Sequence, residues 1–74
     1  MQEMQLTAVL RQEGNLVTSF CPELDVASQG TSFEEAKENL KEAVELLLDV
    51  ASDDEITVRY LQPLFVSSLE VKVG

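Results

Sequence analysis

Apolar and polar positions alternate in the first third of the chain. This period of two, over 5–11 and again over 16–21, predicts two strands joined by a polar turn at 12–15. Gly14 lies in that turn, where a positive φ is often required. Pro22 has no N–H to donate to a strand ladder, so it ends the second strand. The two strands are therefore expected to form a hairpin.

The pattern then changes from a strand period to a helix period. After a bend at 23–25, a short third strand is expected over 26–29, and Gly30 lets the chain turn. Over 33–50 the apolar residues recur every three and four positions, which is typical of a helix with one buried stripe. The stripe consists of Phe33, Ala36, Leu40, Ala43, Val44, Leu47 and Leu48.

The start of this helix has two possible caps. Ser32 can accept from the Glu35 N–H while the Glu35 carboxylate reaches back to the Ser32 N–H, which is a capping box. Thr31 with Glu34 forms the same motif one residue earlier. Both frames place acids in the first helical turn, where the helix dipole favours them.

The last third of the chain contains one ambiguous segment and one clear one. Asp53 or Asp54 can cap a helical turn over 56–61, but Thr57-Val58 can equally begin a strand. Residues 65–73 alternate and predict a final strand. One face of it carries Phe65, Ser67, Leu69, Val71 and Val73, and the other carries Val66, Ser68, Glu70 and Lys72.

The predicted fold is therefore α+β, in the order β-β-β-α-β, with a small antiparallel-rich sheet and one helix packed on one face. Phe20, Phe33 and Phe65 are expected in the core. One helix covers only one face of a four-stranded sheet. The other face keeps apolar groups such as Val9 and Val66, and open strand edges invite pairing. These features predict a homo-oligomer, either a dimer or a tetramer.

Length and charge narrow the class of protein. Residues 1–74 are expected to form a single domain, and the formal charge is −9 from 14 acids and 5 bases. Nucleic-acid binding depends on neutralising phosphates, so direct contact with DNA or RNA is not expected. A basic protein partner suits an acidic surface better.

No signal peptide or membrane span is recognised, which predicts a cytoplasmic protein without membrane contact.

Residues for catalysis are scarce. The chain has no His, no glycine-rich phosphate loop and a single cysteine, Cys21, which excludes an intramolecular disulfide. Glu23 and Asp25 lie near a strand end and Glu70 lies on the last predicted strand, but turn chemistry accounts for Asp25 better than metal binding does. Cys21 is expected to be a buried apolar filler. The sequence thus predicts no enzyme activity, no metal and no cofactor.

Two acidic surfaces are candidates for binding a partner. One is the polar side of the long helix, and the other is the turn after the second strand. The candidate residues are Glu38, Glu42, Glu45 and Asp49 on the helix, and Glu23 and Asp25 in the turn. The sequence does not choose between these surfaces.

Five sequence segments together resemble one known family. They are Phe20-Cys21-Pro22-Glu23-Leu24-Asp25, Ser28-Gln29-Gly30, Ser32 with Glu35-Ala36, Asn39-Leu40-Lys41-Glu42-Ala43, and the stretch 65–74. In their order and spacing, they are similar to short stand-alone members of the HicB family (UPF0150, or HicB N-terminal domain, type). The resemblance covers nearly the whole chain.

The resemblance implies a reduced RNase H-like fold without that enzyme's metal-binding carboxylates. It also implies an antitoxin that neutralises a small basic HicA-like toxin, which cleaves mRNA. Longer family members add a C-terminal DNA-binding module, and this chain is expected to have none. Two alternatives remain. One is an orphan self-associating structural or adaptor module without a toxin, and the other is a vestigial RNase H-like nuclease.

Overall fold

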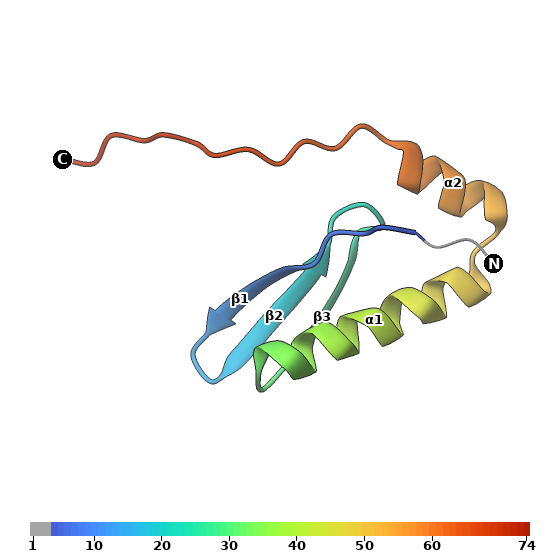
Figure 1. Cartoon of the computed structure of the whole chain (residues 1–74), viewed down its shortest axis with the longest axis horizontal. Coiled ribbons are helices and arrows are strands. Elements are labelled where there is room, and N and C mark those ends of the chain that lie inside the picture. Colours follow the sequence, from blue (N-terminus) through green and yellow to red (C-terminus); the bar gives the residue numbers. More distant parts are fainter. Residues whose placement is uncertain (1–3) are drawn as a thin grey trace.

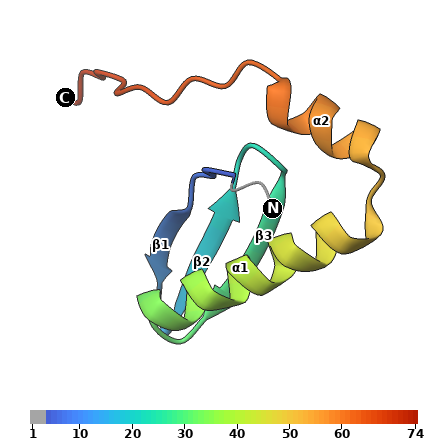
Figure 2. The ribbon, with the colours of Figure 1, turned by 45° about the vertical axis from the view of Figure 1, so that its right-hand side comes forward.

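A computed structural model describes residues 4–74 of the protein. It contains one antiparallel sheet in the strand order β1-β2-β3. One long helix, α1 (Phe33–Val50), crosses a single face of this sheet, as Figures 1 and 2 show. A second helix, α2 (Asp53–Leu61), follows after a short link, and the chain then continues as an extended segment. The α+β class predicted from the sequence is confirmed.

The hairpin forms with a shifted first strand. Strand β1 (Val9–Glu13) pairs with β2 (Leu16–Cys21) through a two-residue turn, so Glu13 lies opposite Leu16. Gly14 opens this turn with φ 62°, a value that glycine adopts without strain. The prediction of a strand over 5–11 was wrong by several residues. The reason is a tertiary contact: the Thr7 N–H donates to the Glu23 carboxylate.

Strand β3 (Val26–Gly30) and helix α1 lie close to their predicted bounds. The Ser32 hydroxyl caps α1 by accepting from the Glu35 N–H at 3.1 Å. The Glu35 carboxylate completes the motif differently from the expected box, because it accepts from the Thr31 N–H at 3.0 Å. The Ser32–Glu35 frame is therefore confirmed as the cap, and Thr31 of the other frame contributes only its backbone N–H.

The core lies between α1 and the inner face of β2 and β3. Its fully or nearly buried apolar members are Val17, Cys21, Leu24, Ala36, Leu40 and Val44. The buried Ser19 hydroxyl donates to the Ala36 carbonyl at 2.9 Å, which ties the sheet to the helix. At Gly30 a Cβ would lie only 2.6 Å from the Ala36 nitrogen, so glycine permits this close approach.

The three phenylalanines lie outside this core, contrary to the sequence prediction. Phe20 is 38 % exposed, Phe33 is 50 % exposed and Phe65 is 90 % exposed. Phe20 lies on the sheet face opposite to that of its neighbours Ser19 and Cys21, because side chains alternate along a strand. Phe33 lies in the first turn of α1, before the stripe meets the sheet.

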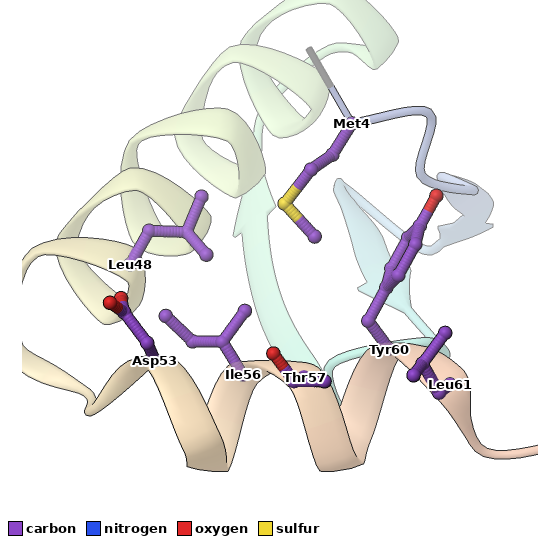
Figure 3. Close-up of a pocket in the computed structure, with 7 residues that line it drawn as sticks. All are labelled: Met4, Leu48, Asp53, Ile56, Thr57, Tyr60 and Leu61. Carbon is purple, nitrogen blue, oxygen red and sulfur yellow. The ribbon is translucent and has the colours of Figure 1, made fainter. Parts of the chain in front are cut away.

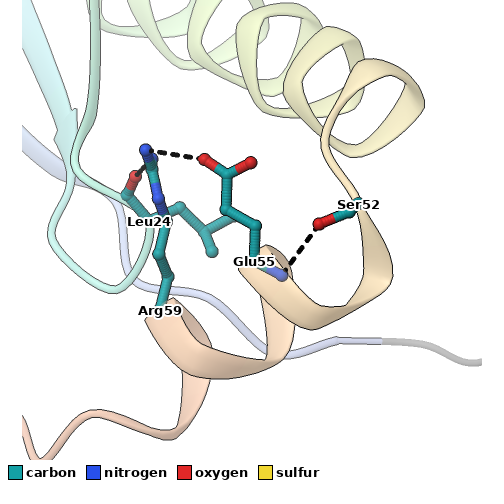
Figure 4. Close-up of polar contacts among 4 residues, drawn as sticks. All are labelled: Leu24, Ser52, Glu55 and Arg59. Atoms are coloured by element: carbon teal, nitrogen blue, oxygen red, sulfur yellow. Dashed lines mark hydrogen bonds and ion pairs between the residues drawn. The ribbon is translucent and has the colours of Figure 1, made fainter.

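Helix α2 resolves the ambiguity over 56–61 in favour of a helix. Its N-cap is Ser52, whose hydroxyl accepts from the Glu55 N–H at 3.1 Å, and not Asp53 or Asp54. Figure 4 shows how α2 is attached to the sheet. The Arg59 guanidinium donates to the Leu24 carbonyl at 2.8 Å and pairs with Glu55 at 3.2 Å.

The final strand predicted over 65–73 does not form in the structure. Residues 63–74 are extended but belong to no sheet, and all of them are exposed. Figures 1 and 2 show this segment running clear of the three strands. The sheet therefore has three strands instead of four, and the element order is β-β-β-α-α. The alternating pattern is present, but the segment has no neighbouring strand in the structure.

Candidate interaction surfaces

The outer side of α1 carries an acidic face, which we define as Glu38, Glu42, Glu45 and Asp49. Spacings of three and four residues place these side chains on one side of the helix, and all four residues are exposed. Residues 4–74 contain two ion pairs, Arg11–Glu13 and Arg59–Glu55, and neither involves α1. The last turn of α1 has no basic residue. The negative end of the helix dipole therefore adds to the negative charge around Asp49, in the last turn of this face.

The second candidate surface, the turn after β2, is organised differently. The Glu23 carboxylate accepts from the Thr7 N–H at 3.0 and 2.9 Å and from the Thr7 hydroxyl at 2.7 Å. Desolvation acts to raise the pKa of Glu23, but these hydrogen bonds outweigh it and hold the pKa below its ordinary value. Glu23 thus attaches the N-terminal segment to the β2–β3 turn.

Asp25 supplies a residue with positive φ in the same turn. Its φ of 56° places it in the left-handed region, which Asp and Asn tolerate better than most residues. The side chain is exposed. The structure does not join the two candidate surfaces. Glu23 bonds to Thr7 at the β2–β3 turn, whereas the acids of the acidic face are exposed along α1.

Cys21 is enclosed, as expected of an apolar filler. It is 1 % exposed, and burial raises the pKa of its thiol, with the nearby Glu23 charge acting in the same direction. A raised pKa lowers the fraction of reactive thiolate at neutral pH. Within residues 4–74 no group of three or more His, Cys, Asp or Glu side chains is arranged to hold a metal ion.

Two hollows adjoin the N-terminal segment 4–8. The first, of about 790 Å³, lies between the ends of α1 and α2, and Figure 3 shows Met4 pointing into it between Leu48 and Tyr60. The second, which we call the α1 groove, has a volume of about 560 Å³ and lies between α1 and segment 4–8. Its lining combines apolar residues with two acids and two lysines: Met4, Leu6, Thr7, Ala8, Cys21, Glu34, Lys37, Glu38, Leu40, Lys41 and Val44. Glu38 thus lies at the border between this groove and the acidic face. No sequence pattern indicated either hollow, because each depends on where segment 4–8 folds back.

The sheet face opposite α1 is largely apolar at one end. Val9, Phe20 and Ala27 lie in register across the three strands. Val9 and Phe20 are 48 % and 38 % exposed. The position of Val9 on the uncovered face, predicted from the sequence, is confirmed. In the described part of the chain, no helix is both long and apolar enough to cross a membrane.

Comparison with known proteins gives one informative relative. A UPF0150 protein of Helicobacter pylori is 35 % identical over 69 residues, which cover 92 % of this chain and 96 % of that protein. No family model matches the chain, and no solved structure matches it significantly. Identity at this level over nearly the full length of both proteins shows common descent, and it agrees with the resemblance seen in the motifs between 20 and 43. The chain therefore belongs to the UPF0150, HicB-like family.

Proposed function

We propose that this protein is a non-enzymatic, antitoxin-like binding protein that neutralises a small basic HicA-like toxin in the cytoplasm. Two things support the proposal. The chain belongs to a HicB-like family, and its longest helix presents an acidic face that has no ion-pair partner within residues 4–74. The second observation carries the proposal, because it supplies the chemistry that recognises a basic surface.

The charge distribution favours binding through α1. This helix carries six acids and two lysines, and its four outward acids extend along three turns. A patch of one sign raises the association rate with an oppositely charged protein and disfavours like-charged competitors. We infer that a basic HicA-like protein approaches along the acidic face, and that its active surface is covered once the complex forms.

The turn residues are weaker candidates for this contact. Glu23 already uses both carboxylate oxygens in hydrogen bonds to Thr7. A partner would have to displace those bonds to reach it. Asp25 stays available at the rim of the turn. We therefore assign the main contact to Glu38, Glu42, Glu45 and Asp49, and require no cofactor or metal for it.

The direct test is inhibition of a purified HicA-like ribonuclease from the same organism. We expect the full chain to form a stoichiometric complex with it and to stop mRNA cleavage. If neither binding nor inhibition occurs at about 10 μM, a concentration that detects even weak complexes, the proposal is wrong. The orphan self-associating module would then be the better description.

Charge reversal locates the contact. Glu42→Lys with Glu45→Lys replaces two negative charges with two positive ones, so the net charge of the acidic face changes by four units. We expect the association rate at low salt to fall at least about tenfold. Asp54→Lys with Glu70→Lys makes the same change in net charge outside α1. This control is expected to slow association much less. Equal effects of the two double variants would refute the placement on α1.

A further inference from the structure

The segment 65–73 has every property of a strand except a partner. Its apolar residues alternate with polar ones, its backbone is extended, and its large side chains are almost fully exposed. Leu69 is 85 % exposed and Val73 is 96 % exposed. A soluble protein rarely leaves such a row of apolar groups open to water unless the row binds something.

The exit of this segment from α2 directs it away from its own sheet. Arg59 holds α2 against the Leu24 carbonyl of the β2–β3 turn. Gln62 caps α2 with an extended backbone (φ −64°, ψ 134°), and the following Pro63 favours that conformation. In both views the segment then passes the β2–β3 turn end of the sheet and stays clear of all three strands (Figures 1 and 2). With the junction in this conformation, the segment forms no ladder with that sheet.

The sheet has two edge strands, β1 and β3, and the β1 edge is the more open of the two. On the β3 side, α1 packs along the strand, and the Asn39 amide donates to the Gln29 carbonyl at 2.8 Å. On the β1 side, α1 packs only lightly, and β1 has β2 as its single neighbour. Every second residue of an edge strand directs its N–H and C=O away from the sheet. The β1 edge is thus available to one more antiparallel or parallel strand.

The α1 groove lies beside that edge. It opens on the helix-covered side of the sheet, next to the start of β1, and its apolar lining includes Leu6, Leu40 and Val44. A strand added next to β1 would direct alternate side chains toward this groove. The segment 65–73 offers such a set on one face: Phe65, Ser67, Leu69, Val71 and Val73.

We propose that two copies of this chain exchange their C-terminal segments, so that residues 65–73 of each copy add as a fourth strand to the β1 edge of the other and fill its α1 groove. The contact is self-complementary, as a two-fold dimer requires. It also supplies the fourth strand that the sequence pattern predicts, but between copies.

Charge and size favour a second copy as the occupant. Residues 62–74 contain one Glu and one Lys, and β1 contains one Arg and one Glu, so neither carries a net side-chain charge. The α1 groove is lined by two acids, Glu34 and Glu38, and by two lysines, Lys37 and Lys41, so its side-chain charges also balance. The proposed interface contains about 25 residues per copy, which matches a standard interface of 20–30 residues a side. They are segment 65–73, segment 4–8, β1 and the α1 residues of the groove.

Sedimentation equilibrium on the full chain tests the exchange. We expect a dimer of twice 8.2 kDa. Leu69→Asp places a charge on the groove-facing set and should move the monomer–dimer midpoint to at least about tenfold higher concentration. Ser68→Asp adds the same charge one residue earlier, on the opposite face, and should move it less than about twofold. Neither variant touches the folded core, so both should keep the helix content of the native chain.

Amide hydrogen exchange identifies the edge. In the dimer, amides of 65–73 and of β1 should be protected together, and Leu69→Asp should abolish the protection in both segments. A monomeric mass at all concentrations would overturn the proposal, whether or not the tail is protected within its own chain. So would a dimer that is unaffected by Leu69→Asp, or one that leaves β1 unprotected.

Discussion

Helix α1 and the segment 65–73 have equally regular apolar patterns but very different surroundings. In α1 the apolar stripe is buried against β2 and β3, with Ala36 at 0 % and Leu40 at 4 % exposure. In the segment 65–73 the corresponding side chains face water, and Leu69 is 85 % exposed. Both patterns specify a local conformation, since α1 is helical and the segment is extended. Only α1 has a surface of the same chain to pack against.

The difference shows what an apolar pattern contributes to a small fold. It selects helix or strand and states which face should be covered. Burial itself depends on a complementary surface, which the first 50 residues provide for α1. For residues 65–73 we have argued that a second copy provides it. The same contrast separates the two exposed surfaces. The acidic face of α1 carries a net negative charge, whereas residues 65–73 and β1 each carry no net side-chain charge.

The largest expected change in the free energy of unfolding comes from truncating Leu40 in α1. The same truncation of Leu69 in the segment 65–73 is the comparison. Leu40→Ala removes a buried side chain from the contact between α1 and the sheet, and should lower the free energy of unfolding by about 2–4 kcal/mol. Leu69→Ala should change it by less than about 0.5 kcal/mol in dilute, monomeric protein. Urea unfolding at low protein concentration measures both values. Similar losses for the two variants would break the comparison.

A smaller effect is expected where α1 approaches β3 most closely. In Gly30→Ala the added Cβ would meet backbone atoms of Glu35 and Ala36, at 2.9 Å and 2.6 Å. Since backbone cannot move aside as a side chain does, we expect a loss of about 1–3 kcal/mol. Gln29→Ala, at the neighbouring exposed position, is the control and should stay within about 0.5 kcal/mol of the native chain. Thermal unfolding followed by circular dichroism distinguishes the two.

The smallest effect concerns Glu23, which holds segment 4–8 beside the β1 edge. Because the pKa of Glu23 is lowered in the folded protein, its contribution is present above the ordinary value of 4.5 and is lost as the pH falls through the folded pKa. Glu23→Gln should therefore be about 1 kcal/mol less stable at pH 7, from the loss of charge-assisted hydrogen bonds. The difference should shrink as the pH is lowered through the acid range.

Glu38→Gln is the matched control for that experiment. It also removes one acid, but from the exposed acidic face, where the structure shows no hydrogen bond to the side chain among residues 4–74. Its unfolding free energy should differ little from that of the native chain. A pH-independent difference between Glu23→Gln and the native protein would contradict the role given to the Thr7 contact.

Much of the fold could be predicted from local patterns. The bounds of α1 follow from the Ser32 cap and the spacing of apolar residues, and β2 follows from alternation that ends at Pro22. These features depend on neighbours within a few positions. The family could also be recognised, because its motifs lie within the continuous stretch from 20 to 43.

The errors arose where distant contacts decide the structure. Thr7 bonds to Glu23, sixteen residues away, and this contact draws 5–8 out of the hairpin. Arg59 bonds to the Leu24 carbonyl and positions α2, which lies between α1 and the expected last strand. The candidate acids were correctly predicted to be exposed on α1. Their spacing did not reveal that Glu23 serves an internal contact instead.

The central claim is that two exposed surfaces bind two kinds of partner. The most direct test is an amide chemical-shift map of the ¹⁵N-labelled full chain, recorded first through a dilution series and then during titration with a purified HicA-like protein. Dilution should shift resonances of 65–73, of β1 and of the groove residues Leu40 and Val44 on α1. The titration should shift those around Glu38, Glu42, Glu45 and Asp49. One shared set of residues responding to both, or no response on α1, would contradict the account.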